Sequence, residues 1–272
     1  MLSWIRISFA SLLFVGAVLV LPLHAQNTEQ LQVGPPPLHR AEPPAPGASA
    51  EELDRRGDEL RIEKNYLDAI DYYTAAIKLK TPGNNSSLLN KMGISQLMLQ
   101  RYKEAKKSFN RALKADGRHA DAYNNLAVVY YQEHNYGRAI KLYEKAISIN
   151  PDSSSYYSNL GAAYFNKKNF EKATINYAKA LQLDPDVFER TSHAGVQAQL
   201  PSPEDRARYD YVLAKLYARS GVVERSLHYL KKALEDGYKD IGNVYKDNEF
   251  AELRKDPRFA ELMAAKTVAL PE

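Results

Sequence analysis

Small and apolar residues recur along this chain with a period of 34 residues. A small residue follows Leu or Met in three successive segments, at Met92-Gly93, Leu126-Ala127 and Leu160-Gly161. Downstream of each pair come an Ala, an aromatic residue and a second Ala at fixed spacing: Ala105, Phe109 and Ala112, then Ala139, Tyr143 and Ala146, then Ala173, Tyr177 and Ala180. Such a period predicts a helical array whose units bury their apolar faces on one another.

Each unit is expected to form two antiparallel helices. In the third unit the apolar spacing predicts a first helix from Asp121 to Glu133 and a second from Tyr136 to Ile149. Pro151 is expected to stop the second helix. The small residues Ala127 and Ala139 would let the two backbones approach, with aromatic rings beside them.

These positions resemble the tetratricopeptide repeat (TPR), most fully in the third and fourth units. The matching residues are Leu126, Ala127, Tyr130, Ala139, Tyr143, Ala146 and Pro151, and then Tyr157, Leu160, Gly161, Tyr164, Ala173, Tyr177, Ala180 and Pro185. The resemblance implies an all-α fold, a right-handed α-solenoid of about five helix-turn-helix repeats. The units are expected near residues 50–83, 86–119, 120–153, 154–186 and 203–237, with an insertion at 187–202.

The turn inside each unit departs from the family. Glycine is common there in TPR proteins because it suits a left-handed backbone, but this chain has it only at Gly221. The equivalent places hold Lys64, Gln100, His134 and Lys168. We therefore expect positive φ at four residues that carry side chains, at a cost of roughly 1–2 kcal/mol each.

The two ends of the chain differ from the repeats. Residues 1–25 have one basic residue before an apolar run and a small residue at Ala25, which predicts a signal peptide; a retained membrane anchor is the alternative. Residues 26–49 are rich in proline and predict an extended linker. Residues 238–272 lose the period, and we expect a helical cap over the last apolar face.

Composition argues against several kinds of chemistry. The chain lacks cysteine, which excludes disulfides and thiolate sites, and its six histidines form no paired metal-binding spacing. No phosphate-binding glycine loop or nucleophile motif appears. The net charge of +4 combines 37 basic and 33 acidic residues, which indicates an interspersed, solvated surface and gives little support for nucleic-acid binding. We therefore expect a non-enzymatic protein without cofactor or metal.

The remaining candidate site is the concave groove that the first helices of a TPR array line. The resemblance places Asn125 and Asn159 in this groove, where their amides would pair with an extended peptide; Tyr131 and Phe165 would flank them, with Val128 between. Lys215 and Arg219, with Lys91 as a supplement, could bind a carboxylate.

The sequence thus predicts an exported scaffold or adaptor of the cell envelope, periplasmic or secreted, that binds a protein or peptide. One alternative is a membrane-tethered envelope assembly factor, which would contact the membrane only if residues 1–25 are uncleaved. Another is the regulatory subunit of an enzyme, because regulation would use the same groove.

Overall fold

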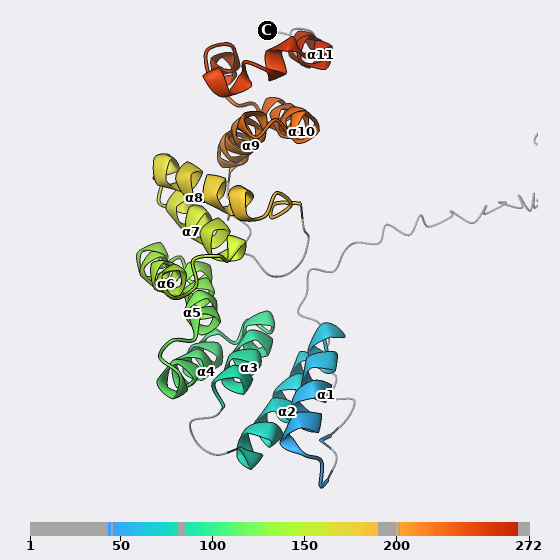
Figure 1. The fold of residues 1–272 in the computed structure, drawn as a ribbon, viewed down its shortest axis with the longest axis vertical. Coiled ribbons are helices and arrows are strands. Elements are labelled where there is room, and N and C mark those ends of the chain that lie inside the picture. The colour runs from blue at the N-terminus through green and yellow to red at the C-terminus, as the bar shows by residue number, and fades with distance from the viewer. Residues whose placement is uncertain (1–42, 45, 81–84, 190–199, 201, 266–272) are drawn as a thin grey trace, which may run out of the picture. The chain divides into compact units, whose positions relative to one another are not determined.

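The computed structural model describes residues 43–44, 46–80, 85–189, 200 and 202–265 of the chain (Figure 1). The expected signal peptide, residues 1–25, lies outside the described residues, as does most of the proline-rich linker and of the 187–202 insertion. No helix among the described residues is both long enough and apolar enough to cross a membrane.

The described part of the chain is built from helices, and ten of them form five consecutive pairs (Figure 1). The pairs are α1 (Ala50–Ile62) with α2 (Tyr66–Leu79), α3 (Ser86–Met98) with α4 (Tyr102–Ala115), α5 (Ala120–Gln132) with α6 (Tyr136–Ile149), α7 (Ser154–Asn166) with α8 (Phe170–Leu183), and α9 (Pro203–Arg219) with α10 (Val223–Glu235). The predicted second helix of the third unit is confirmed at both ends, and the first begins and ends one residue earlier than expected.

In the first, second and fourth pairs the two helices meet where a glycine faces an aromatic ring. A Cβ atom at Gly161 would lie 2.5 Å from the ring of Tyr177, and one at Gly93 would lie 2.6 Å from the ring of Phe109. Both rings are fully buried. Because no carbon atom fits at these distances, glycine at these positions lets the two backbones approach with the ring between them.

The turns inside the units confirm the predicted left-handed backbone. Lys64, Gln100, His134 and Lys168 have φ between 57° and 66°, and Gly221 has φ of 73°. In the third unit the amides of His134 and Asn135 donate to the carbonyls of Tyr131 and Tyr130, at 2.9 and 2.8 Å. These two bonds satisfy carbonyls at the end of α5, which offsets part of the cost of positive φ at His134.

Neighbouring units among the first four stack mainly by packing the second helix of one unit on the first helix of the next. The second helix of one unit packs on the first helix of the next, in the pairs α2–α3, α4–α5 and α6–α7, and the first helices α1, α3, α5 and α7 also contact one another in series. Short connections, such as the one from Ile149 to Ser154, require the next first helix to start where the preceding second helix ended. The helices α3, α5 and α7 therefore run in the same direction.

The fifth unit breaks this rule, because α9 runs parallel to α8. Near the start of both helices, Lys168 pairs with Asp205. At the other end, the Tyr217 hydroxyl donates to Glu189, which follows α8, at 3.3 Å. The 19 residues 184–202 permit this arrangement, since the chain must return along a 14-residue helix of about 21 Å before α9 begins. Ser202 caps α9, and its hydroxyl accepts a hydrogen bond from the Asp205 amide at 3.1 Å.

The terminal segment packs on α9 and α10. It comprises three short 3-10 helices, η1 (Ile241–Tyr245), η2 (Asn248–Phe250) and η3 (Leu253–Lys255), and then α11 (Pro257–Ala265). Phe250, Leu253 and Phe259 are buried in one core with residues of α9 and α10. This segment covers the last apolar face, as expected of a cap, but most of it is 3-10 turns and only α11 is an α-helix.

The buried tyrosine hydroxyls generate a stability prediction. Among the described residues, the hydroxyls of Tyr143 and Tyr177 are buried without a hydrogen-bond partner, whereas the equivalent Tyr73 donates to Asp58 at 2.8 Å. Tyr143→Phe and Tyr177→Phe should leave the free energy of unfolding unchanged or raise it by about 1 kcal/mol, because an unpaired buried polar group is removed. Tyr73→Phe should lower it by about 1 kcal/mol.

Urea unfolding of the three variants measures these effects, and Phe109 shows that phenylalanine fits at this position of a unit. A loss in Tyr143→Phe as large as that in Tyr73→Phe would mean that the Tyr143 hydroxyl has a partner after all.

Candidate functional site: the first-helix face and the cleft beside α9

Side-chain amides join the first helices of three successive units. The Asn125 amide donates to Asn90 on α3 at 3.0 Å, and the Asn124 amide donates to Asn125 at 3.2 Å. The Asn159 amide on α7 donates to Asn124 at 2.9 Å. These four residues form one chain of amides across α3, α5 and α7, which we call the amide ladder. It fixes the lateral register of the first helices, because each rung needs its neighbour's amide at hydrogen-bond distance.

The two asparagines predicted to bind a ligand, Asn125 and Asn159, differ in burial. Asn159 is completely buried, whereas Asn125 is half-buried and uses one donor and one acceptor within the ladder. An amide group has two of each, so Asn125 retains a donor and an acceptor that a ligand could use. Sequence equivalence could not separate the two residues, because their different burial depends on the packing around each unit.

The predicted aromatic flanks are packing residues in this structure. Tyr131 is fully buried, and its hydroxyl accepts from the Asn166 amide at 2.7 Å. Phe165 is also buried, with Phe170 and Tyr209 edge-on to its ring at 5.1 and 5.8 Å between ring centroids. A ligand cannot contact either ring without a rearrangement. Val128, on α5 between Asn125 and Tyr131, is half-buried.

The predicted basic residues are already paired, with one exception. The Lys91 ammonium lies 2.8 Å from Asp54 and 2.6 Å from Asp58. Burial opposes its charge, but hydrogen bonds to these two aspartates outweigh burial and raise the pKa of Lys91. Both aspartates are on α1, so this ion pair joins the first helices of units one and two rather than offering a free cation.

Lys215 is held in the same way by the terminal segment. It lies 3.0 Å from Asp247 and 3.4 Å from Glu249, and these hydrogen bonds raise its pKa against the opposing effect of burial. Arg219 is exposed and has no ion pair with any described residue. The structure therefore does not bring Lys215 and Arg219 together as a vacant carboxylate site.

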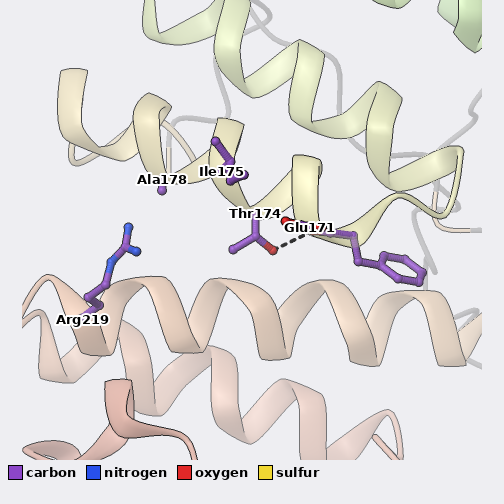
Figure 2. Close-up of a pocket in the computed structure, with 6 residues that line it drawn as sticks. Glu171, Thr174, Ile175, Ala178 and Arg219 are labelled. Carbon is purple, nitrogen blue, oxygen red and sulfur yellow. Dashed lines mark hydrogen bonds between the residues drawn. The ribbon is translucent and has the colours of Figure 1, made fainter.

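Sequence reasoning missed a cleft between α8 and α9, which Figure 2 shows with Arg219 on α9 facing α8. Its volume is about 450 Å³, and it is lined by Phe170, Glu171, Thr174, Ile175, Ala178 and Arg219. A second hollow of about 390 Å³ shares Phe170 and Thr174 and continues along α9 past Val212 and Lys215. The cleft exists because α9 runs parallel to α8. The long insertion before α9 is the one feature of the sequence that could have indicated this arrangement.

The cleft suits apolar side chains rather than chemistry. Ile175 is 60% exposed there, and the Thr174 hydroxyl donates to the Phe170 carbonyl of its own helix. Glu171 and Arg219 lie toward opposite ends of the cleft (Figure 2). No cluster of three or more histidine, aspartate or glutamate residues that could hold a metal occurs in the described part of the chain.

Comparison with known proteins supports the repeat assignment. Models of the tetratricopeptide repeat match residues 90–154 and 154–187, which contain most of α3 and all of α4 to α8. No curated protein matches the chain. The helix pairs and their stacking define a helical-repeat protein. Its repeats over residues 90–187 are tetratricopeptide repeats, so the chain is a protein that contains tetratricopeptide repeats.

Several solved structures are similar at low identity. MamA (residues 41 to the end) from Desulfovibrio magneticus RS-1 is 21% identical over 70% of this chain and 96% of its own, with a TM-score of 0.49. A thermophilic TPR protein of Thermus thermophilus is 20% identical over 79% of this chain and 100% of its own, with a TM-score of 0.48. These similarities are too weak to identify the repeats, so the identification rests on the family models. Repeats of this family are in general non-catalytic protein-interaction modules, so the chain is a protein-interaction scaffold.

The amide ladder generates a second stability prediction. Asn159→Ala should lower the free energy of unfolding by about 1–3 kcal/mol, because it removes a buried rung and leaves the Asn124 oxygen without its donor. Asn110→Ala, at an exposed asparagine on α4, should change it by less than about 0.5 kcal/mol. Urea unfolding measures both. Equal effects of the two substitutions would show that the ladder does not stabilise the stacking of units.

Proposed function

We propose that this scaffold binds an extended segment of another protein along the face formed by α3, α5 and α7. The observation that carries the proposal is the near absence of charge on these helices. Their 39 residues include one basic residue, Lys91, and one acidic residue, Asp121. A face with half-buried apolar side chains and amides suits a peptide that contributes hydrophobic side chains and backbone hydrogen bonds.

Three half-buried residues form the core of this proposed face. Ile94 on α3 and Val128 on α5 are equivalent, 34 residues apart, and Asn125 lies one turn from Val128 with unused hydrogen-bonding capacity. The lateral contacts between first helices hold these residues in a row. A row at the repeat spacing would engage successive parts of one extended ligand, which gives affinity without a deep pocket.

A charge placed on this face should weaken partner capture. Val128→Glu is expected to reduce capture of a partner from cell extracts about tenfold, because a carboxylate would be desolvated against apolar ligand groups. Ser148→Glu adds the same charge at an exposed position of α6 in the same unit and should leave capture unchanged. Quantitative pull-down with circular dichroism of both variants is the measurement.

Ile94→Glu repeats the test at the equivalent position of the second unit. If both glutamate variants of the face fold normally and capture partners as well as Ser148→Glu does, the partner binds elsewhere and this face has another role.

We also propose that the scaffold works in the cell envelope, as a periplasmic or secreted protein. Support comes from the apolar stretch in residues 1–25 and the small residue at Ala25. Amino-terminal sequencing of the protein recovered from the producing cell should give a mature start near Gln26. A start at Met1 with the protein in the membrane fraction would support the tethered assembly factor instead, and a start at Met1 in the cytosol would contradict export.

A further inference from the structure

Charge is divided unequally between the two kinds of helix in units two to four. The second helices α4, α6 and α8 carry ten basic and three acidic residues, a net charge of +7 (10 − 3). The first helices of the same units sum to zero (1 − 1). Because the whole chain has a net charge of +4, the rest of it sums to −3 (4 − 7). Positive charge is thus concentrated on one layer, unlike the interspersed surface that composition suggested.

Six of these cations form a set that we call the cationic band. Its members are Lys103, Lys107, Arg111 and Lys114 on α4 and Lys141 and Lys145 on α6; all are exposed, and none forms an ion pair with a described residue. The repeat places them in register, since Lys141 lies 34 residues after Lys107 and Lys145 lies 34 after Arg111. Equivalent positions of stacked units face the same way, so the cations of α4 and α6 gather on one surface.

The few acidic residues on α4 and α6 do not neutralise this surface. Glu104 is the only acidic residue of α4, and Glu144 is the only one of α6. Glu144 accepts a hydrogen bond from the Tyr164 hydroxyl at 2.8 Å, which directs it toward α7. Unpaired cations on adjacent helices repel one another, so an anionic partner that lies over both helices relieves that repulsion.

From this arrangement we propose that the cationic band docks on the surface of a membrane rich in anionic lipids. Five of its six members are lysines, which act as flexible point charges; recognition of carboxylates on a folded protein favours the planar fork of arginine. Clusters of lysine at a surface are the usual basis of attraction to anionic headgroups. Single-stranded nucleic acid would need exposed rings for stacking, and the aromatic residues Tyr102 and Tyr136 on these helices are half-buried.

The second helix of the fourth unit, α8, supplies a second observation that favours a lipid surface. At the position of α8 equivalent to Lys107 and Lys141 the chain has Ile175, which is 60% exposed. A large apolar side chain exposed beside a row of cations is poorly placed in water, and it would be partly buried at a lipid interface. The inference does not depend on the proposed peptide-binding face, because that face lies on the other layer of helices and stays accessible when the second helices are covered.

Vesicle binding tests the proposal. The full chain is mixed with vesicles of equal parts phosphatidylcholine and phosphatidylglycerol, or of phosphatidylcholine alone, and the bound fraction is measured by flotation. Any insertion of the apolar residues 1–25 contributes to both vesicle types, so the difference between them reports the charge-dependent part. We expect at least tenfold stronger partition to the anionic vesicles at low salt, decreasing as salt is raised.

Matched charge reversals locate the effect. Lys107→Glu with Lys141→Glu should remove most of the difference, at least a tenfold loss, while circular dichroism and the thermal midpoint stay unchanged because both side chains are exposed and unpaired. Lys167→Glu with Lys246→Glu changes the net charge equally at exposed, unpaired lysines outside the band and should alter the partition less than about threefold.

Three outcomes would overturn the proposal. Equal partition to both vesicle types excludes electrostatic docking on lipid. Equal losses in the two double variants show that net charge rather than the cationic band is responsible. Binding to polyglutamate or to duplex DNA, without binding to anionic vesicles, assigns the band to a different class of partner.

Discussion

The close approach of paired helices at a small residue is the constraint on which the rest of the structure depends. At Gly161 and Gly93 the ring of the second helix fills the space that a Cβ atom would occupy. This contact sets the distance between the two helices of a unit. Because a small residue recurs at this place every 34 residues from Gly93 to Gly161, units two to four share one backbone geometry and can stack by repeating one interface.

Stacking then separates the molecule into two chemically different layers. The first helices are joined by the amide ladder and by the ion pair of Lys91 with Asp54 and Asp58, so most of their polar groups are satisfied within the array. On the second helices Lys106 pairs with Glu133, but the six members of the cationic band are exposed and have no ion pair with a described residue. One layer therefore offers apolar groups and amides, and the other offers charge, which permits two partners at once.

The sequence predicted those features that depend on local pattern. The helix pairs and the four positive-φ turns follow from residue types at fixed spacing. It did not predict features that depend on contacts between distant segments. The burial of Asn159 depends on the packing around its unit, which the repeat pattern does not specify. Lys215 pairs with Asp247, which lies outside the repeats. The direction of α9 also could not be derived, because residues 184–202 carry length but no pattern.

That reversed helix has an electrostatic consequence. At one edge of the array α3, α5 and α7 begin and α4, α6 and α8 end, so the first helix of each of these units contributes a positive pole there and the second helix a negative one. Since α9 is parallel to α8, the fifth unit exchanges the two poles: α9 ends at this edge and α10 begins there. Arg219 stands in the last turn of α9 and Arg225 pairs with Asp186 close by. Arg219 therefore lies at the negative pole of α9, where the helix dipole favours a cation, at a place where the preceding units have the start of a first helix.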